Sequence, residues 1–246
     1  MTETKKKHGL SINVEEMANA GLHIGHKTSR IHPKMGPYLS GKRNSIHLIN
    51  LEETAKYLKE VLNFIEGLIL ENKVIVLVGT KIQIKNLVKD VATECDLPYV
   101  NERWLGGTFT NFEIIKKRID GFKDLEKKKA VGELDKYTKK EKAKFDKQLR
   151  NMEIKFGGLK NLERLPDAIL VLNMQKDELA VKEARMKGII IISITDTNTN
   201  PTLTDYFIPA NDDAVTSVKY ILDRVKEVIL RAREEVNSKK QELKKD

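Results

Sequence analysis

The sequence predicts an α/β protein with a doubly wound parallel sheet, into which an antiparallel coiled-coil helical hairpin is inserted. Short continuous apolar runs such as Lys73–Gly79 have the length of strands that are buried on both faces. Segments with apolar residues at helical spacing alternate with these runs, as they do in a parallel sheet with crossover helices. The alternation stops between Phe112 and Leu162, where apolar residues recur every three or four positions along two stretches.

The chain before the insertion supplies the first half of the predicted sheet. Val14–Gly21 reads as a short helix closed by its glycine. The stretch from Gly21 to Arg43 is rich in glycine, proline and basic side chains, and its lack of an apolar period predicts a long loop. The expected order then runs strand, helix, strand, helix, strand over Ser45–Asn50, Leu51–Leu70, Lys73–Gly79, Ile82–Cys95 and Pro98–Val100.

The chain after the insertion resumes the alternation. Gly188 ends one expected helix, and Asn211 is suited to cap the last one, which we expect to run through Arg231. The order before that helix is strand, helix, strand and short edge strand over Ala168–Asn173, Asp177–Lys187, Ile189–Ile194 and Tyr206–Ile208. Strands and helices in this succession predict a Rossmann-like or flavodoxin-like architecture.

The inserted segment has its own apolar pattern and most of the charge. From Lys116 to Lys160, 16 Lys and Arg residues stand against 8 Asp and Glu residues, so this arm holds nearly all of the chain's net charge of +9. Gly132 marks the turn between two helices that pack along a seam. The seam residues are Phe112, Ile115, Ile119 and Phe122 on the first helix, and Phe145, Leu149, Met152, Phe156 and Leu159 on the second.

These patterns divide the chain into four parts. Residues 1–12 form a flexible basic N-terminus, and residues 13–108 together with 163–232 form the α/β domain. Residues 109–162 are the inserted coiled-coil hairpin. Residues 233–246 are a charged tail of mixed sign, which we expect to be a fraying helix.

The composition excludes several classes of protein. A chain of 246 residues with 40% hydrophobic content can bury a sizeable core, and its pI near 9.3 favours a polyanionic partner. The single cysteine, Cys95, excludes a disulfide framework and a cysteine-rich zinc site. No apolar signal region or membrane-length apolar run occurs, so we expect a soluble, cytoplasmic protein with no membrane partner.

A doubly wound sheet raises the hypothesis of an enzyme, and the sequence offers little chemistry for one. Gly79-Thr80-Lys81 follows a predicted strand, but it matches neither a GxxxxGK[ST] loop nor a GxGxxG fingerprint. No GxSxG elbow occurs, and Cys95 lies within a helical pattern. The alternative that remains is a nucleotide-dependent α/β enzyme with a regulatory arm, which would bind nucleotide at Gly79–Lys81.

Histidines and carboxylates raise the hypothesis of a metal site. His26 belongs to the long predicted loop, while Asp196 and Asp212 follow strands at the carboxyl end of the predicted sheet. If the loop folds over that edge, these three side chains would bind a structural divalent ion, zinc or magnesium. The alternative is that both aspartates are turn and N-cap residues, and the sequence favours it. No general base or nucleophile accompanies the three.

Three ordered stretches resemble a single family. One is RWLGGTFTNF (Arg103–Phe112), which is similar to the hallmark segment of the S-two family, the second protein of the ribosomal small subunit, in its bacterial form. The others are AGLHIGHKTSRIHPKMGPYLSGKRNSIHLINLEET (Ala20–Thr54) and LPDAILVLNMQKDELAVKEARMKGIIIISITDTNTNP (Leu165–Pro201). The resemblance spans the chain from about Ala20 to the helix after Asn211.

The resemblance implies a function without catalysis. It implies a structural constituent of the ribosome that binds small-subunit ribosomal RNA and neighbouring ribosomal proteins, and so supports assembly and translation. In bacteria the family also helps to anchor the large S-one protein. It requires no cofactor and has no small-molecule substrate.

Cationic side chains are the expected RNA contacts, because phosphates dominate such binding. Histidines and Trp104 would stack on unpaired bases, and for Trp104 a core role is an equal alternative. The predicted RNA-binding residues are Lys27, Arg30, His32, Lys34, Lys42 and Arg43 in the long loop, and Arg103, Trp104, Lys116, Lys117 and Arg118 at the root of the arm.

Overall fold

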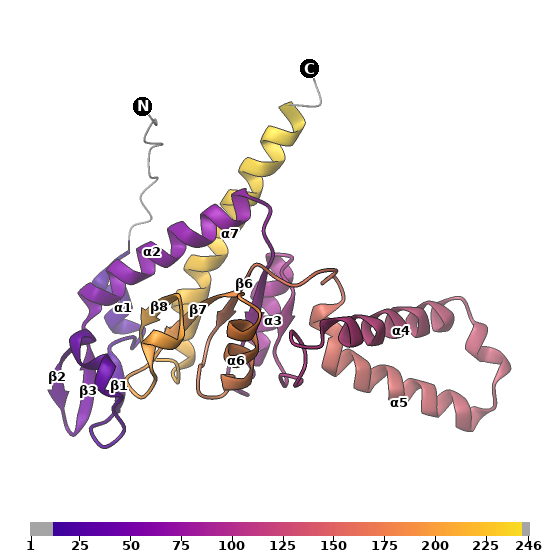
Figure 1. Ribbon diagram of the computed structural model, residues 1–246, viewed down its shortest axis with the longest axis horizontal. Helices are drawn as coiled ribbons and strands as arrows, with labels where there is room; N and C mark the ends of the chain where they lie inside the picture. The colour runs from indigo at the N-terminus through magenta and orange to yellow at the C-terminus, as the bar shows by residue number, and fades with distance from the viewer. Residues whose placement is uncertain (1–11, 243–246) are drawn as a thin grey trace.

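The fold centres on a five-stranded parallel sheet, described by a computed structural model that covers residues 12–242 (Figure 1). The strands are β4 (Ile75–Val78), β5 (Tyr99–Val100), β6 (Ala168–Val171), β7 (Ile190–Thr195) and β8 (Tyr206–Pro209). They lie in the order β5-β4-β6-β7-β8, and every neighbouring pair is parallel. Counted along the chain, this is the order of flavodoxin-like doubly wound sheets, so the predicted α/β class is confirmed.

Successive strand residues point to opposite sides of this sheet, and on both sides they are apolar and buried. Helices therefore cover both faces. Leu77 and Leu170 belong to the core beneath α2, α3 and α7, whereas Val76 and Val171 pack against α6 and the inserted segment. The helices are α1 (Val14–Asn19), α2 (Leu51–Leu70), α3 (Lys85–Glu94), α6 (Glu178–Met186) and α7 (Val215–Glu242). None of the helices in the described part of the chain is long and apolar enough to cross a membrane.

A second, antiparallel sheet replaces the long loop predicted for residues 21–43, and that prediction is wrong. The sheet has the order β1-β3-β2 and consists of β1 (Ile24–Lys27), β2 (Leu39–Arg43) and β3 (Ile46–Ile49), with the 3-10 helix η1 (Pro33–Tyr38) between the first two. Asn44 and Ser45 both have positive φ, as a two-residue hairpin turn requires. Apolar alternation was missing because β2 is almost entirely exposed.

The inserted segment forms two helices, α4 (Phe112–Ala130) and α5 (Lys139–Phe156), that project from the domain side by side (Figure 1). Gly132 has a φ of +76°, which confirms the predicted turn. The predicted seam is buried mainly near the domain, at Ile115, Ile119, Phe122, Leu149 and Phe156. We call this unit the hairpin, and a coiled-coil supercoil of its helices stays a prediction.

Helix α7 is longer than the sequence pattern suggested. Asn211 Oδ1 accepts hydrogen bonds from the backbone N–H of Asp213 at 2.8 Å and of Ala214 at 3.1 Å, so it holds the turn that precedes the helix. The prediction that it is the cap residue is wrong, because α7 begins only at Val215. The predicted end at Arg231 is wrong, since the helix continues to Glu242. Ala232 ends its buried stripe, and no glycine or proline follows to stop the helix. Residues 1–11 of the predicted flexible N-terminus and residues 243–246 of the predicted tail lie outside the described part.

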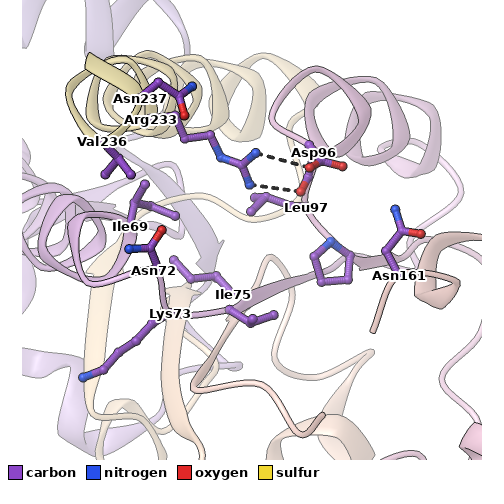
Figure 2. Close-up of a pocket in the computed structure, with 12 residues that line it drawn as sticks. Ile69, Asn72, Lys73, Ile75, Asp96, Leu97, Asn161, Arg233, Val236 and Asn237 are labelled. Carbon is purple, nitrogen blue, oxygen red and sulfur yellow. Dashed lines mark hydrogen bonds and ion pairs between the residues drawn. The ribbon is translucent and has the colours of Figure 1, made fainter. Parts of the chain in front are cut away.

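Helix α7 leaves the domain beside a cavity of about 360 Å³ at the amino-terminal edge of the sheet (Figure 2). Arg233 donates to the carboxylate of Asp96 at 3.4 Å and to its carbonyl oxygen at 3.0 Å. Ile69, Ile75 and Leu97 contribute apolar surface to the lining. Doubly wound sheets bind their ligands at the opposite, carboxyl edge, so we assign these contacts to anchoring α7.

Gly158 offers a test of how the hairpin joins the sheet. A Cβ at this position would lie 2.3 Å from the carbonyl oxygen of Tyr99 in β5, so Gly158→Ala must push the hairpin root away from the sheet. We expect a loss of roughly 1–3 kcal/mol in the free energy of unfolding, measured by urea denaturation. Gly121→Ala is the control, because nothing lies within 4 Å of its Cβ on α4, and it should gain roughly 0.5–1 kcal/mol. Equal effects of the two changes would contradict this account.

Candidate nucleic-acid interface

The loop at the hairpin root is organised around one buried carboxylate, Glu183 of α6, which is only 4% exposed. Glu183 Oε1 accepts from the indole Nε1 of Trp104 at 3.2 Å and from the backbone N–H of Gly107 at 2.8 Å. Its Oε2 accepts from the backbone N–H of Phe109 at 2.9 Å and of Thr110 at 3.2 Å, and from the Thr110 hydroxyl at 3.3 Å. Burial alone would raise the pKa of this carboxyl, but the N–H donors lower the pKa below its usual value. The loop is therefore wrapped around a charge.

Trp104 is a core residue, and the prediction that it stacks on RNA bases is wrong. Its side chain is 6% exposed, and the ring packs edge-on against Phe109 with centroids 4.8 Å apart. Its one polar atom is used by Glu183. No ring face is left for a base, so the alternative core role is the one the structure supports. Arg103, the preceding residue, is exposed.

The first predicted group of cations lies on the small antiparallel sheet. Lys27 and Arg43 are both register partners of Ile46, so they flank it from the two outer strands and share its face. Within residues 12–242, no carboxylate lies within ion-pair distance of any member of the group. We call this group the small-sheet cluster: Lys27, Arg30, Lys34, Lys42 and Arg43.

His32 and Lys34 have structural contacts as well. His32 Nδ1 accepts from the backbone N–H of Lys34 at 3.3 Å and thereby caps η1. Lys34 Nζ donates to the hydroxyl of Thr202 at 2.9 Å. The Lys34 contact ties η1 to the loop that follows β7, whereas the His32 contact is local to η1, so an RNA contact by His32 stays a prediction.

The second predicted group lies at the hairpin root, where α4 and α5 join the side of the α/β domain away from the small sheet (Figure 1). We call Arg103, Lys116, Lys117 and Arg118 the root cluster, and all four are exposed. Lys116 Nζ donates to the carbonyl oxygen of Glu163 at 2.9 Å. The structure does not bring the two clusters together, so they present two separate cationic surfaces.

The carboxyl edge of the parallel sheet gathers the residues of the predicted metal site. His26 Nδ1 lies 3.2 Å from Asp196 Oδ1, and His26 Nε2 lies 3.3 Å from Asp213 Oδ2. Lys81 forms an ion pair with Asp213, and its Nζ is 3.9 Å from Asp212 Oδ1. Hydrogen bonding to Asp196 raises the pKa of His26 despite partial burial. Burial, followed by the charge of Asp196, raises the pKa of Asp212 to about 8.

These side chains are engaged with one another rather than arranged around an ion. Each ring nitrogen of His26 lies near a carboxylate, Nε2 also lies 3.1 Å from the amide nitrogen of Asn198, and Asp212 lies 3.9 Å from Lys81. Among the residues that the structure describes, no three His, Cys, Asp or Glu side chains form a group that could hold a metal. Asp196 also accepts from the N–H of Thr197 at 2.5 Å, as expected of a turn residue.

The crevice between β4 and β6, where doubly wound sheets bind nucleotides, is filled by the protein's own groups. Asp177 accepts from the Thr80 hydroxyl at 2.7 Å and from the Thr80 N–H at 3.3 Å. A Cβ on Gly79 would lie 2.8 Å from the side chain of Val88, so helix α3 packs directly on this turn. The predicted strand–helix turn is therefore closed by side-chain contacts.

Two residues of these sites escaped the sequence analysis. Glu183 lies among ordinary helical charges, and only its burial under the root loop sets it apart. Asp213, not Asp212, pairs with His26, and adjacent aspartates carry no signal that tells them apart. The prediction that Asp196 and His26 meet at the sheet edge was conditional on the loop folding over that edge, and their contact is observed.

The fold and these surfaces define a class: an α/β protein with a projecting helical hairpin and two exposed cationic clusters. The sequence model of one family, described as ribosomal protein S2, matches residues 17–232. The chain belongs to that family. It is 42% identical to the small ribosomal subunit protein uS2c of Guillardia theta over 220 residues, 89% of this chain and 94% of the relative. It is 40% identical to the small ribosomal subunit protein uS2 of Pseudoalteromonas atlantica over 224 residues, 91% of this chain and 92% of the relative.

Glu183 provides a pH-dependent prediction. Because its folded-state pKa lies below the unfolded value, its stabilisation is present above about pH 4.5 and is lost as the pH falls through the folded pKa. Glu183→Gln should cost roughly 2–3 kcal/mol in the free energy of unfolding at pH 7, since buried N–H donors lose a charged acceptor. The difference from wild type should shrink below pH 4, measured by urea denaturation.

Glu178→Gln on the same helix is the matched control, because that side chain is 62% exposed and pairs only with Lys182 on the surface. We expect it to change the unfolding free energy by less than about 0.5 kcal/mol. A loss for Glu183→Gln that is the same at pH 3 and pH 7 would show that its charge is not what holds the loop.

Proposed function

We propose that this protein is a structural constituent of the small ribosomal subunit, where it binds ribosomal RNA and neighbouring ribosomal proteins and supports assembly and translation. Membership of the ribosomal protein S2 family carries the proposal. The exposed small-sheet and root clusters supply the chemistry, because cations that are not paired with a carboxylate are free to neutralise phosphates. The predicted location on a cytoplasmic ribosome agrees with the same membership.

The protein is not an enzyme, because the family to which it belongs is one of ribosomal proteins. The alternative hypothesis of a nucleotide-dependent enzyme placed its ligand at Gly79–Lys81. Thr80 is bonded to Asp177 there, and Lys81 is paired with Asp213. Binding then rests on charge and shape, with no small-molecule substrate.

Two predicted partners go further than family membership. The S-one protein is one, and we keep it as an expectation from the family resemblance. The structural divalent ion at His26, Asp196 and Asp212 is the other. It would require Asp212 to turn away from Lys81 and His26 to release a carboxylate. Imidazole and carboxylate ligands of this kind suit zinc.

The ion is tested by melting the purified protein in the presence of zinc or magnesium. A structural ion raises the melting temperature of the wild type and leaves that of His26→Asn unchanged, because only the wild type offers the imidazole. The gain should disappear on adding a chelator. An unchanged melting temperature of the wild type would remove the ion from the site.

The small-sheet cluster is tested by reconstitution of salt-washed small subunits. Changing Lys27, Arg30 and Arg43 to Ala removes three proposed phosphate contacts. At 0.1 M salt we expect the affinity to fall on the order of 100-fold, since each contact contributes about 0.7–0.9 to the slope of log K against log salt. Incorporation is measured by sedimentation.

The matched control removes three exposed cations outside the small-sheet cluster, with Lys56, Lys59 and Lys89 of α2 and α3 changed to Ala. This variant has the same net charge and should be incorporated nearly as well as the wild type. Equal incorporation of both variants would remove the small-sheet cluster from the binding surface.

A further inference from the structure

A groove of about 490 Å³ runs along the hairpin root, between α5, the first turns of α4 and the start of the root loop. We call it the α5 groove. Its floor is apolar and its rim is polar. The floor residues are Leu105, Ile115, Met152 and Phe156, and the rim residues are Arg118, Lys144, Lys147, Gln148, Asn151 and Lys155.

The charge of the α5 groove has a single sign. Its four cations are exposed, and no described carboxylate lines the groove or lies within ion-pair distance of them. Three other cations of the hairpin are paired with carboxylates. Lys129 is paired with Asp146 at 2.7 Å, Lys142 with Asp135 at 3.0 Å, and Lys160 with Glu126 and Glu153. The groove therefore presents four cations and no described carboxylate on one surface.

The cations are arranged in a row. Lys144, Lys147 and Lys155 share one face of α5, and the row from first to last spans about 16 Å at a rise of 1.5 Å per residue. Gln148 and Asn151 stand between them on the same face. Arg118 faces the row from α4. A row of this length matches a few consecutive phosphates of one nucleic-acid strand rather than a single anion.

The walls of the groove are held in place from inside the protein. Phe156 and Ile115 on the floor are 4% and 5% exposed. Leu105 is fixed because its carbonyl oxygen accepts from the Thr108 hydroxyl at 2.6 Å, and the next residues of that loop are bonded to Glu183. A ligand thus meets a surface that is already formed, which lowers the cost of binding.

We propose that the α5 groove binds the sugar–phosphate backbone of an RNA strand, with Arg118, Lys144, Lys147 and Lys155 on the phosphates. Gln148 and Asn151 supply neutral donors and acceptors of the kind that contact ribose hydroxyls. The apolar floor contacts the carbon atoms of the sugar. The inference rests on the proposed function and adds a further RNA-binding surface to it. Arg118 is the one residue that this surface shares with the root cluster.

The test compares two triple variants with equal charge. The groove variant removes three lysine charges from the groove, by Lys144→Gln, Lys147→Gln and Lys155→Gln. The control variant removes three exposed lysine charges of the same hairpin outside the groove, by Lys127→Gln, Lys128→Gln and Lys140→Gln. Affinity for small-subunit ribosomal RNA is measured across a range of salt, and thermal melting checks the fold. The groove variant should lose on the order of 100-fold at 0.1 M salt and about 2–3 from the log–log slope. The control should keep most of both.

The outcomes separate the two proposals. If the wild type does not bind ribosomal RNA, the proposed function fails. If it binds and the two variants lose affinity equally or not at all, the groove proposal alone is overturned. A polyglutamate peptide is the second probe, because an acidic protein segment would also suit the charge. Loss of peptide binding with RNA binding intact in the groove variant would assign the groove to a protein and refute the RNA site.

Discussion

The carboxylate of Glu183 is the interaction on which the arrangement of the molecule depends. It lies on α6, behind the parallel sheet, yet its hydrogen bonds are all to the loop that begins the hairpin. One buried charge thus fixes the direction in which α4 leaves the domain. The stabilisation comes from five donors, of which the Trp104 indole N–H and the Phe109 N–H would otherwise be buried without an acceptor. The positions of the root cluster and of the α5 groove both depend on this loop.

The carboxyl edge of the sheet, where related architectures hold a ligand, is closed by the protein itself. Thr80 and Asp177 occupy one part of it, and the network of His26, Asp196 and Asp213 occupies another. The contacts of His26 join the small antiparallel sheet to the α/β domain. Side chains at this edge, which bind ligands in related architectures, here attach the small antiparallel sheet and its cations to the α/β domain.

The sequence predicted the large elements well, because they bury regular apolar patterns. Leu51–Leu70 agrees with α2 at both ends, and each strand of the parallel sheet lies within two residues of its expected position. In the small sheet, β3 was predicted as Ser45–Asn50, because His47 and Ile49 alternate as buried residues, whereas β1 and β2 were missed because they have no buried residue.

The candidate sites were predictable only in part, for a related reason. Exposed cations are visible in the sequence, but Trp104 could be assigned to the core only once Glu183 was seen to cover its indole N–H. The cations of the α5 groove looked like any solvated helical face. What distinguishes Lys144, Lys147 and Lys155 is that they line one groove, and that groove depends on how two helices are placed against a loop.

The place where the hairpin joins the domain has a wider consequence. The chain departs after β5 and comes back beside it, where Gly158 touches Tyr99, so the insertion begins and ends at nearly the same point. Turns could be added to or removed from both helices together without disturbing any strand. The length of the hairpin is therefore independent of the stability of the α/β domain, and evolution can change the length without changing the stability.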